Sequence, residues 1–273
     1  MADAAHQGTK WIMRAGYGAR GVIYIIVGGL ALTAALRGGD AKGTKGALAT
    51  LQNEPMGLTL LWCIAAGLGA YMIWRLVDAV LDLEDHGTDL KGIFARLCTA
   101  ATGVIHGAIG LSVAGLARGG AADDSSARDW TAQIMQMPMG PYLVALVAAV
   151  FLSAGIYYAH KGLTGSYRTH LSTAPFTQRA QPVLTFGLVV HGAMLALVGM
   201  SLGFAAWHTD PSDAGGIGQA LETLRALAWG RFLLAGAGLG LLGFAVYNLV
   251  EAAYRVIPHI SGPNVPTLAD QTA

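Results

Sequence analysis

Six polar side chains could support chemistry because they recur at matching positions of three similar segments. The segments begin at Gly57, Gly140 and Gly230, and the matching positions lie 18 and 21 residues further on. Those positions hold Arg75 and Asp78, then Tyr158 and Lys161, then Asn248 and Glu251. Since residues three apart share a helical face, each pair should point the same way. The pattern predicts one polar cluster, either a set of ion pairs with Lys161 between the two carboxylates or a vestibule for an ion, proton or lipid headgroup.

Tyr24, His106 and His191 form a second candidate site, at equivalent places in three other apolar segments. Each lies about 10 Å along its helix from the same end, so the three side chains could converge at one depth. Two imidazoles at one level could ligate haem or a metal ion, contact a quinone or transfer protons. The favoured interpretation is a hydrogen bond from each histidine to a backbone carbonyl or a carboxylate. The third position is a tyrosine and no second histidine pair matches the first, so we predict no metal site and treat haem or quinone as minor alternatives.

A third cluster lies in the loop that follows the first of the polar pairs. Its members are Asp82, Glu84, Asp85, His86 and Asp89. Their spacing fits no metal-binding pattern, and we expect a solvated acidic loop. The chain also lacks a Walker motif, a nucleophile elbow, HExxH and CxxC. We therefore predict no catalytic residues and favour a protein that is not an enzyme.

The segments that must position these residues are long enough to cross a membrane. The 20 residues from Pro55 to Trp74 carry no charge, which corresponds to a helix of about 30 Å. Of all residues, 54% are hydrophobic and only 12% charged, well below the charged fraction of a soluble domain. The chain is therefore predicted to be all-α and polytopic. The predicted spans cover about residues 15–37, 56–80, 94–117, 139–162, 182–207 and 229–253.

The first span also has the features of a signal peptide, because Lys10, Arg14 and Arg20 precede an apolar run. It aligns with two later segments that cannot be signal peptides, so we interpret it as a membrane span. The six spans form three helical hairpins, and a short amphipathic stretch within each hairpin should lie at the membrane interface. The predicted organisation is repeat 1 at 1–88, repeat 2 at 89–175, repeat 3 at 176–256 and a flexible tail at 257–273.

Two spans per repeat give every repeat the same orientation, which predicts a pseudo-threefold axis along the membrane normal. Glycines four apart should allow close helix packing, at Gly103 and Gly107, Gly199 and Gly203, and Gly236 and Gly240. An aromatic belt is expected at Trp74, Tyr157, Tyr158 and Tyr247. Lys and Arg number ten on the side that holds both termini and seven on the other, which favours cytoplasmic termini. The net charge of +1 without basic clusters argues against a nucleic-acid partner.

Several motifs resemble one known family. GYGARGVIY lies in the first span, PMG opens the second at Pro55, and WRLVDA follows from Trp74. Together with the triplicated hairpin, they resemble the bacterial membrane family catalogued as domain of unknown function 1206. The resemblance implies a six-helix bundle in the bacterial plasma membrane without a settled activity. Lys161 replaces the acidic residue in repeat 2, and repeat 3 lacks the proline before Gly230.

These observations leave three hypotheses for function. The first is a structural or accessory subunit that packs against other membrane proteins, a second copy or lipids. The second is a small ion or proton pathway along the repeat axis, lined by the polar cluster. The third is a redox subunit that binds haem or quinone through His106 and His191.

Overall fold

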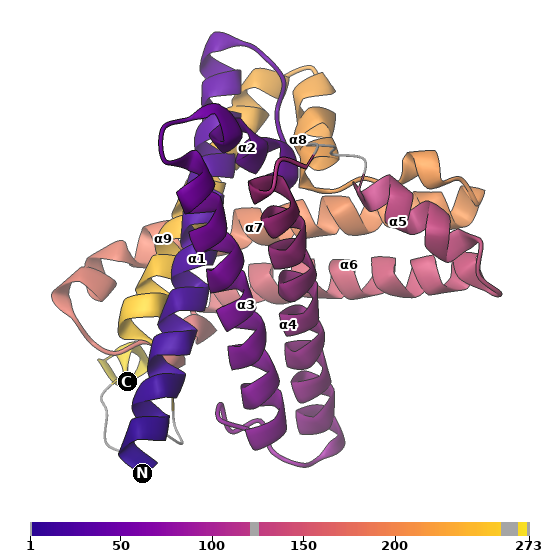
Figure 1. Cartoon of the computed structure of the whole chain (residues 1–273). Helices are drawn as coiled ribbons and strands as arrows, with labels where there is room; N and C mark the ends of the chain where they lie inside the picture. The colour runs from indigo at the N-terminus through magenta and orange to yellow at the C-terminus, as the bar shows by residue number, and fades with distance from the viewer. Residues whose placement is uncertain (1, 121–125, 258–266, 272–273) are drawn as a thin grey trace.

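Six long helices form the protein in the computed structural model, which describes residues 2–120, 126–257 and 267–271. The long helices are α1 (Ala2–Arg37), α3 (Gly57–Leu81), α4 (Leu90–Ala117), α6 (Gly140–Thr164), α7 (Pro175–His208) and α9 (Gly230–Tyr254) (Figure 1). Each is long and apolar enough to span a membrane. A helix satisfies its own backbone hydrogen bonds, which a segment surrounded by lipid requires. The predicted all-α fold with six spans is confirmed.

Short helices connect the two long helices of each repeat. They are α2 (Thr44–Ala49), α5 (Ser126–Met135) and α8 (Ile217–Ala226). Leu48 of α2 and Leu221 of α8 are completely buried, whereas Trp130 of α5 is 64% exposed. The connecting helices of repeats 1 and 3 therefore cover the bundle, as an apolar stripe on a short helix predicts.

The start of α7 differs from the prediction. The predicted span begins at residue 182, but α7 begins at Pro175 and continues through Pro182. The side chain of Thr177 accepts a hydrogen bond from Ala174 N at 2.9 Å and so caps the first turn. A proline in the first turn of a helix lacks only an N–H that has no partner within the helix, which suits Pro175 to that position.

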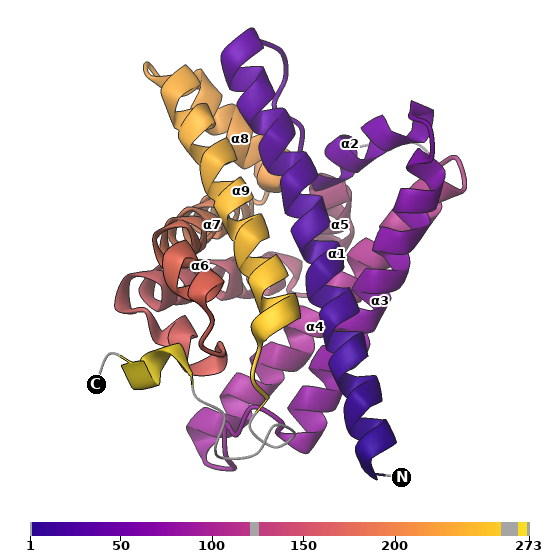
Figure 2. The same ribbon diagram turned by 90° about the vertical axis from the view of Figure 1, so that its left-hand side faces the viewer.

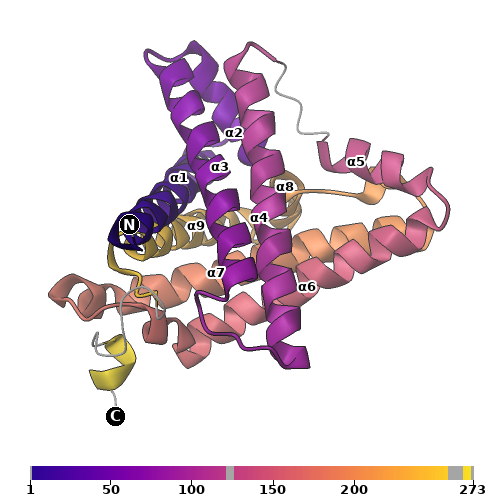
Figure 3. The ribbon, with the colours of Figure 1, turned by 60° about the horizontal axis from the view of Figure 1, so that its bottom comes forward.

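The second helix of each repeat packs most closely on the first helix of the next. The three close pairs are α3 with α4, α6 with α7, and α9 with α1. Figure 2 shows α1 and α9 running side by side, so the last helix of the chain closes against the first. The α3–α4 pair crosses the α6–α7 pair steeply (Figure 3). The three repeats thus pack in a cyclic order, in keeping with the predicted pseudo-threefold arrangement.

The cyclic packing is incomplete in repeat 2, because its two long helices do not pack closely on each other. In repeats 1 and 3 the two long helices also pack on each other, α1 on α3 and α7 on α9, but α4 and α6 make at most a minor contact. As a result, only 17% of the most apolar stretch of α6 is buried inside the protein, compared with 61% for α9. Repeat 2 therefore presents the largest share of its helical surface to its surroundings.

Glycines allow the close helix pairs, although not all of the predicted ones take part. A Cβ atom on Gly107 would lie 2.3 Å from Met72 Sδ, and one on Gly199 would lie 2.9 Å from the Leu152 backbone nitrogen. By contrast, a Cβ atom on Gly236 would have no heavy atom within 4 Å, so its predicted role in close packing is wrong. Spacing alone does not tell which face of a helix meets a neighbour.

Part of the C-terminal segment packs on the protein, although the sequence predicted a flexible tail over 257–273. Leu268, in the short helix η4 (Leu268–Gln271), is 1% exposed, and its N–H donates to the Leu171 carbonyl at 2.9 Å. The segment lacks helical periodicity, so its sequence does not reveal that it docks through backbone hydrogen bonds. Residues 258–266, 272 and 273 lie outside the described part of the chain.

Candidate functional site

A group of buried, ion-paired side chains lies where α3 and α9 end. We call it the ion-pair cluster, and its members are Arg75, Asp78, Glu84, Glu251 and Arg255. Arg75 donates to Asp78 Oδ2 and to Glu84 Oε1, both at 3.3 Å. Arg255 donates to Glu84 and to Glu251. Asp78 and Glu251 are completely buried, so two guanidinium groups connect three carboxylates inside the protein.

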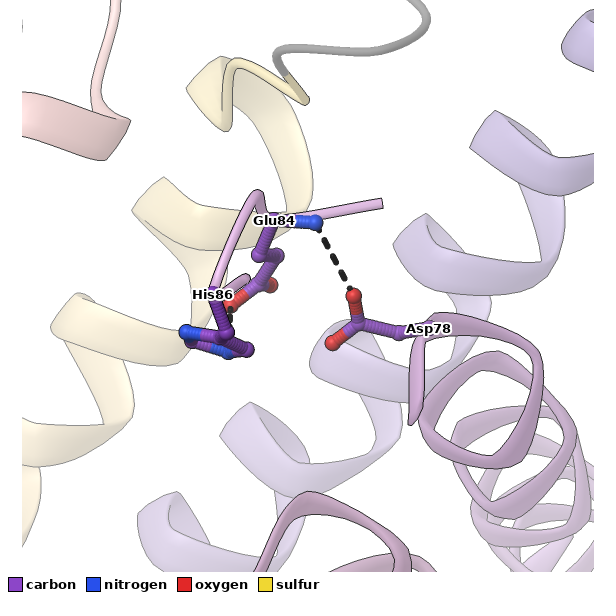
Figure 4. A group of neighbouring side chains, drawn as sticks. All are labelled: Asp78, Glu84 and His86. Carbon is purple, nitrogen blue, oxygen red and sulfur yellow. Dashed lines mark hydrogen bonds and ion pairs between the residues drawn. The ribbon is translucent and has the colours of Figure 1, made fainter. Parts of the chain in front are cut away.

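The loop after α3 turns back and places Glu84 in the cluster. Asp82 and Asp85 have positive φ angles of 52° and 59°, which reverse the chain within a few residues. The carboxylate of Asp82 accepts hydrogen bonds from His86 N at 2.8 Å and Gly87 N at 2.9 Å. Glu84 N donates to Asp78 Oδ1 at 3.1 Å, which joins the loop to the helix end (Figure 4). The prediction of a fully solvated acidic loop is therefore wrong for Glu84.

Electrostatic attraction keeps Glu84 and Arg255 ionised. Burial by itself would raise the pKa of Glu84, but Arg255 and Arg75 hold that pKa well below its usual range. Burial likewise opposes the charge on Arg255, whereas Glu251 and Glu84 raise the pKa of its guanidinium. Buried charges are stable only when paired and hydrogen-bonded. Each of these groups therefore depends on its partners from another part of the chain.

Asp78, Glu84 and His86 offer ligand atoms within 4.8 Å of one another, close enough for a metal ion (Figure 4). Three of the four carboxylate oxygens already accept hydrogen bonds: Asp78 accepts from Arg75 and from Glu84 N, and Glu84 Oε1 accepts from both arginines. His86 Nε2 lies 3.9 Å from Glu84 Oε2. A cation here would compete with two guanidinium groups, so the arrangement suits ion pairs better than metal ligation.

Arg255 takes the place that the sequence suggested for Lys161. Lys161 Nζ instead lies 5.7 Å from the ring centroid of Tyr247 and 5.9 Å from that of Tyr157. Tyr247 in turn donates to Glu251. Lys161 therefore lies at the margin of the cluster, since a matching depth along the helix does not fix the direction of the side chain.

The structure places the other two predicted members away from the ion pairs. Asn248 is completely buried and donates from Nδ2 to the Phe244 carbonyl at 2.7 Å. Tyr158 packs on His191, with ring centroids 4.9 Å apart. The cluster also contains Glu84 and Arg255, which the sequence comparison missed. Arg255 follows Glu251 by four residues, a spacing that favours an ion pair and could have revealed it.

Tyr24 and His191 come together inside the bundle, and His106 lies on the other side of Arg20. The rings of Tyr24 and His191 are 5.2 Å apart, and Phe244 stacks on His191 at 3.7 Å. His106 packs on Tyr71 at 4.8 Å, and its Nδ1 lies 2.8 Å from the Thr102 carbonyl. This backbone hydrogen bond is the interpretation favoured for a histidine at that position.

Arg20 is a buried cation, although the sequence places it in a basic N-terminal stretch and gives no sign of its burial. It is 3% exposed, and its NH1 group donates to the Tyr71 hydroxyl at 2.8 Å. Arg75 donates to the same hydroxyl from Nε at 3.1 Å. Tyr71 therefore connects Arg20 in the middle of α1 with the ion-pair cluster.

The predicted aromatic belt is wrong for two of its four members. Trp74 is completely buried and Tyr247 is 3% exposed, so neither faces the membrane interface. Tyr157, at 59% exposed, lies at the surface as predicted. The four residues lie at similar positions along their helices, but the close pairing of the helices turns Trp74 and Tyr247 inward.

We expect the protein to lose stability between pH 7 and pH 5 partly through His170. Burial, followed by the charge of Arg255, lowers the pKa of His170 to about 4, whereas an unfolded histidine has a pKa of about 6.5. The folded state thus binds fewer protons, so this contribution is complete above the unfolded pKa and is lost as the pH falls toward the folded one. The measurement is the unfolding free energy of wild type and His170→Gln at several pH values.

Between pH 7 and pH 5, the unfolding free energy of His170→Gln should decline less steeply than that of wild type. His160→Gln is the matched control, because His160 is exposed on α6, and it should retain the wild-type slope. Equal slopes for wild type and His170→Gln would contradict the assignment.

Comparisons with known proteins identify relatives without an assigned activity. The profile of a family described as "Domain of Unknown Function (DUF1206)" matches residues 15–82, 98–165 and 186–255. A Bacillus subtilis (strain 168) protein described as "Uncharacterized protein YxxB" is 28% identical over 257 residues, which cover 91% of this chain and 94% of that protein. No solved structure matches the chain. Each matched stretch lies inside one of the three predicted repeats.

Proposed function

Because this chain belongs to the DUF1206 family, whose description assigns no activity, we propose a role from its geometry: an accessory membrane protein that packs laterally against another membrane protein or a second copy. We place it in the bacterial plasma membrane with both termini in the cytoplasm, on the charge distribution described above. The observation that carries the proposal is the way the ion-pair cluster uses its charges. Its carboxylates bind guanidinium groups of the same chain.

A permeation pathway would need those carboxylates to line a water-filled passage. Asp78 and Glu251 are instead completely buried, and each accepts hydrogen bonds from an arginine. Two surface cavities of the described chain lie elsewhere. They have volumes of about 250 and 390 Å³ and are lined from the C-terminal end of α1, around Arg37 and Gly38. The ion-pair cluster therefore supports a structural role better than a conducting one.

The lack of close packing between α4 and α6 supports a partner that binds to the side of the protein, within the membrane. Leu111 on α4 is 78% exposed and Leu146 on α6 is 63% exposed. In repeats 1 and 3 the corresponding helices pack on each other, which reduces the surface available to lipid. Since lipid provides little hydrophobic driving force between helices, a partner would bind here through shape and close packing.

We expect wild-type protein in liposomes to conduct protons no faster than empty liposomes under an imposed pH gradient. Asp78→Asn should leave this flux unchanged and lower the unfolding temperature, because it removes the charge that pairs with Arg75. The measurement is the decay of an internal pH dye, with size-exclusion chromatography as the check on folding. A wild-type flux that Asp78→Asn abolishes would overturn the proposal in favour of a proton pathway.

Binding of a partner to the exposed surfaces of α4 and α6 can be tested with a photo-crosslinking amino acid at Leu111 or Leu146 in cells. We expect one defined protein adduct from these positions and only lipid adducts from Leu239 on α9, a control that is 51% exposed. The mass of the adduct distinguishes a second copy from a different protein. Lipid adducts alone at all three positions would contradict a protein partner.

A further inference from the structure

We propose that Arg20 and His191 form an intramembrane site for a carboxylate group, either of a small soluble acid or of a fatty acid. The site lies between the helices, separate from the ion-pair cluster, and does not depend on the accessory role. Arg20 lies on α1, five residues after the start of the predicted span at residue 15, about 8 Å along the helix. A cation at that depth needs a partner.

Among the described residues, the surroundings of Arg20 provide hydroxyl groups and rings but no carboxylate. Its guanidinium carbon lies 4.8 Å from the ring centroid of Tyr71 and 5.7 Å from that of Phe244. Tyr24 also interacts with it through the phenol hydroxyl. Within the described residues, every ion pair involves other groups and none includes Arg20.

The ion-pair cluster does not supply the missing charge. Its carboxylates, Asp78, Glu84 and Glu251, are matched in number by the cations around them, Arg75, Arg255 and the nearby Lys161. Arg20 reaches this group only through the Tyr71 hydroxyl. The positive charge of Arg20 therefore stays without a carboxylate of its own.

Two buried donor positions are available to a ligand. Arg20 Nε and His191 Nδ1 are both buried and have no hydrogen-bond partner in the described part of the chain. NH1 of Arg20 is used by Tyr71, whereas Nε belongs to another edge of the guanidinium group. Guanidinium edges bind carboxylates with two parallel hydrogen bonds, the geometry that most strengthens such a pair. His191 is 2% exposed and could donate a further hydrogen bond from its free nitrogen.

The opening between α4 and α6 offers a route from the membrane to the site at Arg20 and His191. His106, which packs on Tyr71 next to Arg20, is only half-buried on α4. Tyr158 on α6 is also half-buried and packs on His191. These two helices are the ones that make at most a minor contact. A fatty acid could thus place its carboxylate at Arg20 and its tail between α4 and α6.

The test measures the unfolding temperature of the protein in nanodiscs against increasing acetate or palmitate, with chloride at matched ionic strength as reference. A ligand that binds only the folded state raises this temperature in a saturable way. We expect such a rise for wild type and for Arg14→Gln, a control because Arg14 is exposed on the same helix. Arg20→Gln should lose the rise, and Arg20→Lys should weaken binding at least tenfold.

The two probes distinguish the sources of the carboxylate. A response to acetate indicates a soluble acid, whereas a response to palmitate alone indicates a lipid. If Arg20→Gln fails to fold, Arg20→Met replaces it, because methionine is unbranched and apolar and fills a buried site without a polar group that needs a partner. The proposal is overturned if neither probe acts, if the rise persists in Arg20→Gln or Arg20→Met, or if a tyrosinate ultraviolet band that Tyr71→Phe removes shows that Tyr71 supplies the charge.

Discussion

Replacing Arg255 by alanine should destabilise the protein by about 3 to 5 kcal/mol, the typical cost of removing one partner from a buried ion pair. Arg255 donates to both Glu84 and Glu251, and its side chain is 2% exposed. The substitution would leave two buried carboxylates without their guanidinium partner. The measurement is the free energy of unfolding in a mild detergent, followed by circular dichroism.

Two further variants show whether the charge or the shape of the Arg255 side chain accounts for the loss of stability. Arg255→Lys retains the charge but not the planar group that reaches two carboxylates, so it should recover only part of the loss. Arg179→Ala removes an exposed arginine in the first turns of α7 and should change stability by no more than about 0.5 kcal/mol. A loss for Arg255→Ala as small as that of Arg179→Ala would mean that the cluster does not stabilise the fold.

Gly57→Ala should destabilise the protein by about 3 kcal/mol, at the upper end of the usual cost of overpacking. A Cβ atom at Gly57 would lie 1.7 Å from the Leu51 carbonyl oxygen, a rigid backbone atom. The same contact recurs in the other repeats, at 2.3 Å for Gly140 and 1.9 Å for Gly230. The repeated glycine thus lets the connecting segment approach the start of the second helix. The unfolding temperature of each variant measures the effect.

Gly69→Ala is the matched control on the same helix. A Cβ atom at Gly69 would have no heavy atom within 4 Å, so this change should be neutral or stabilising by up to about 1 kcal/mol, from the higher helix propensity of alanine. Equal effects of Gly57→Ala and Gly69→Ala would contradict the packing explanation.

The sequence was sufficient to predict the six spans because each is a long apolar run with few charged residues, bounded by prolines, glycines or charges. The matching positions after Gly57, Gly140 and Gly230 also indicated correctly that Asp78 and Glu251 belong to the same end of the bundle. Depth along a helix follows directly from residue number. Predictions that depended on depth alone therefore agree with the structure.

Predictions that depended on the direction in which a side chain points were less successful. Trp74 and Lys161 were placed at the right depth, but the pairing of helices turns Trp74 inward and leaves Lys161 over two tyrosine rings. Glu84 was one of five polar residues in a loop, and only the reversal at Asp82 brings it inside. Three similar repeats also predict three similar interfaces, so the opening between α4 and α6 had no signal in the sequence.

The ion-pair cluster joins the loop after α3 to the end of α9, and the proposed structural role depends on this connection. A double-mutant cycle between Glu84 and Arg255 tests it most directly, through the unfolding free energies of wild type, Glu84→Gln, Arg255→Met and the double variant. We predict a coupling energy of about 2 kcal/mol or more, in the upper part of the range for contacting residues. A coupling energy below about 0.5 kcal/mol, the value for independent sites, would contradict the account.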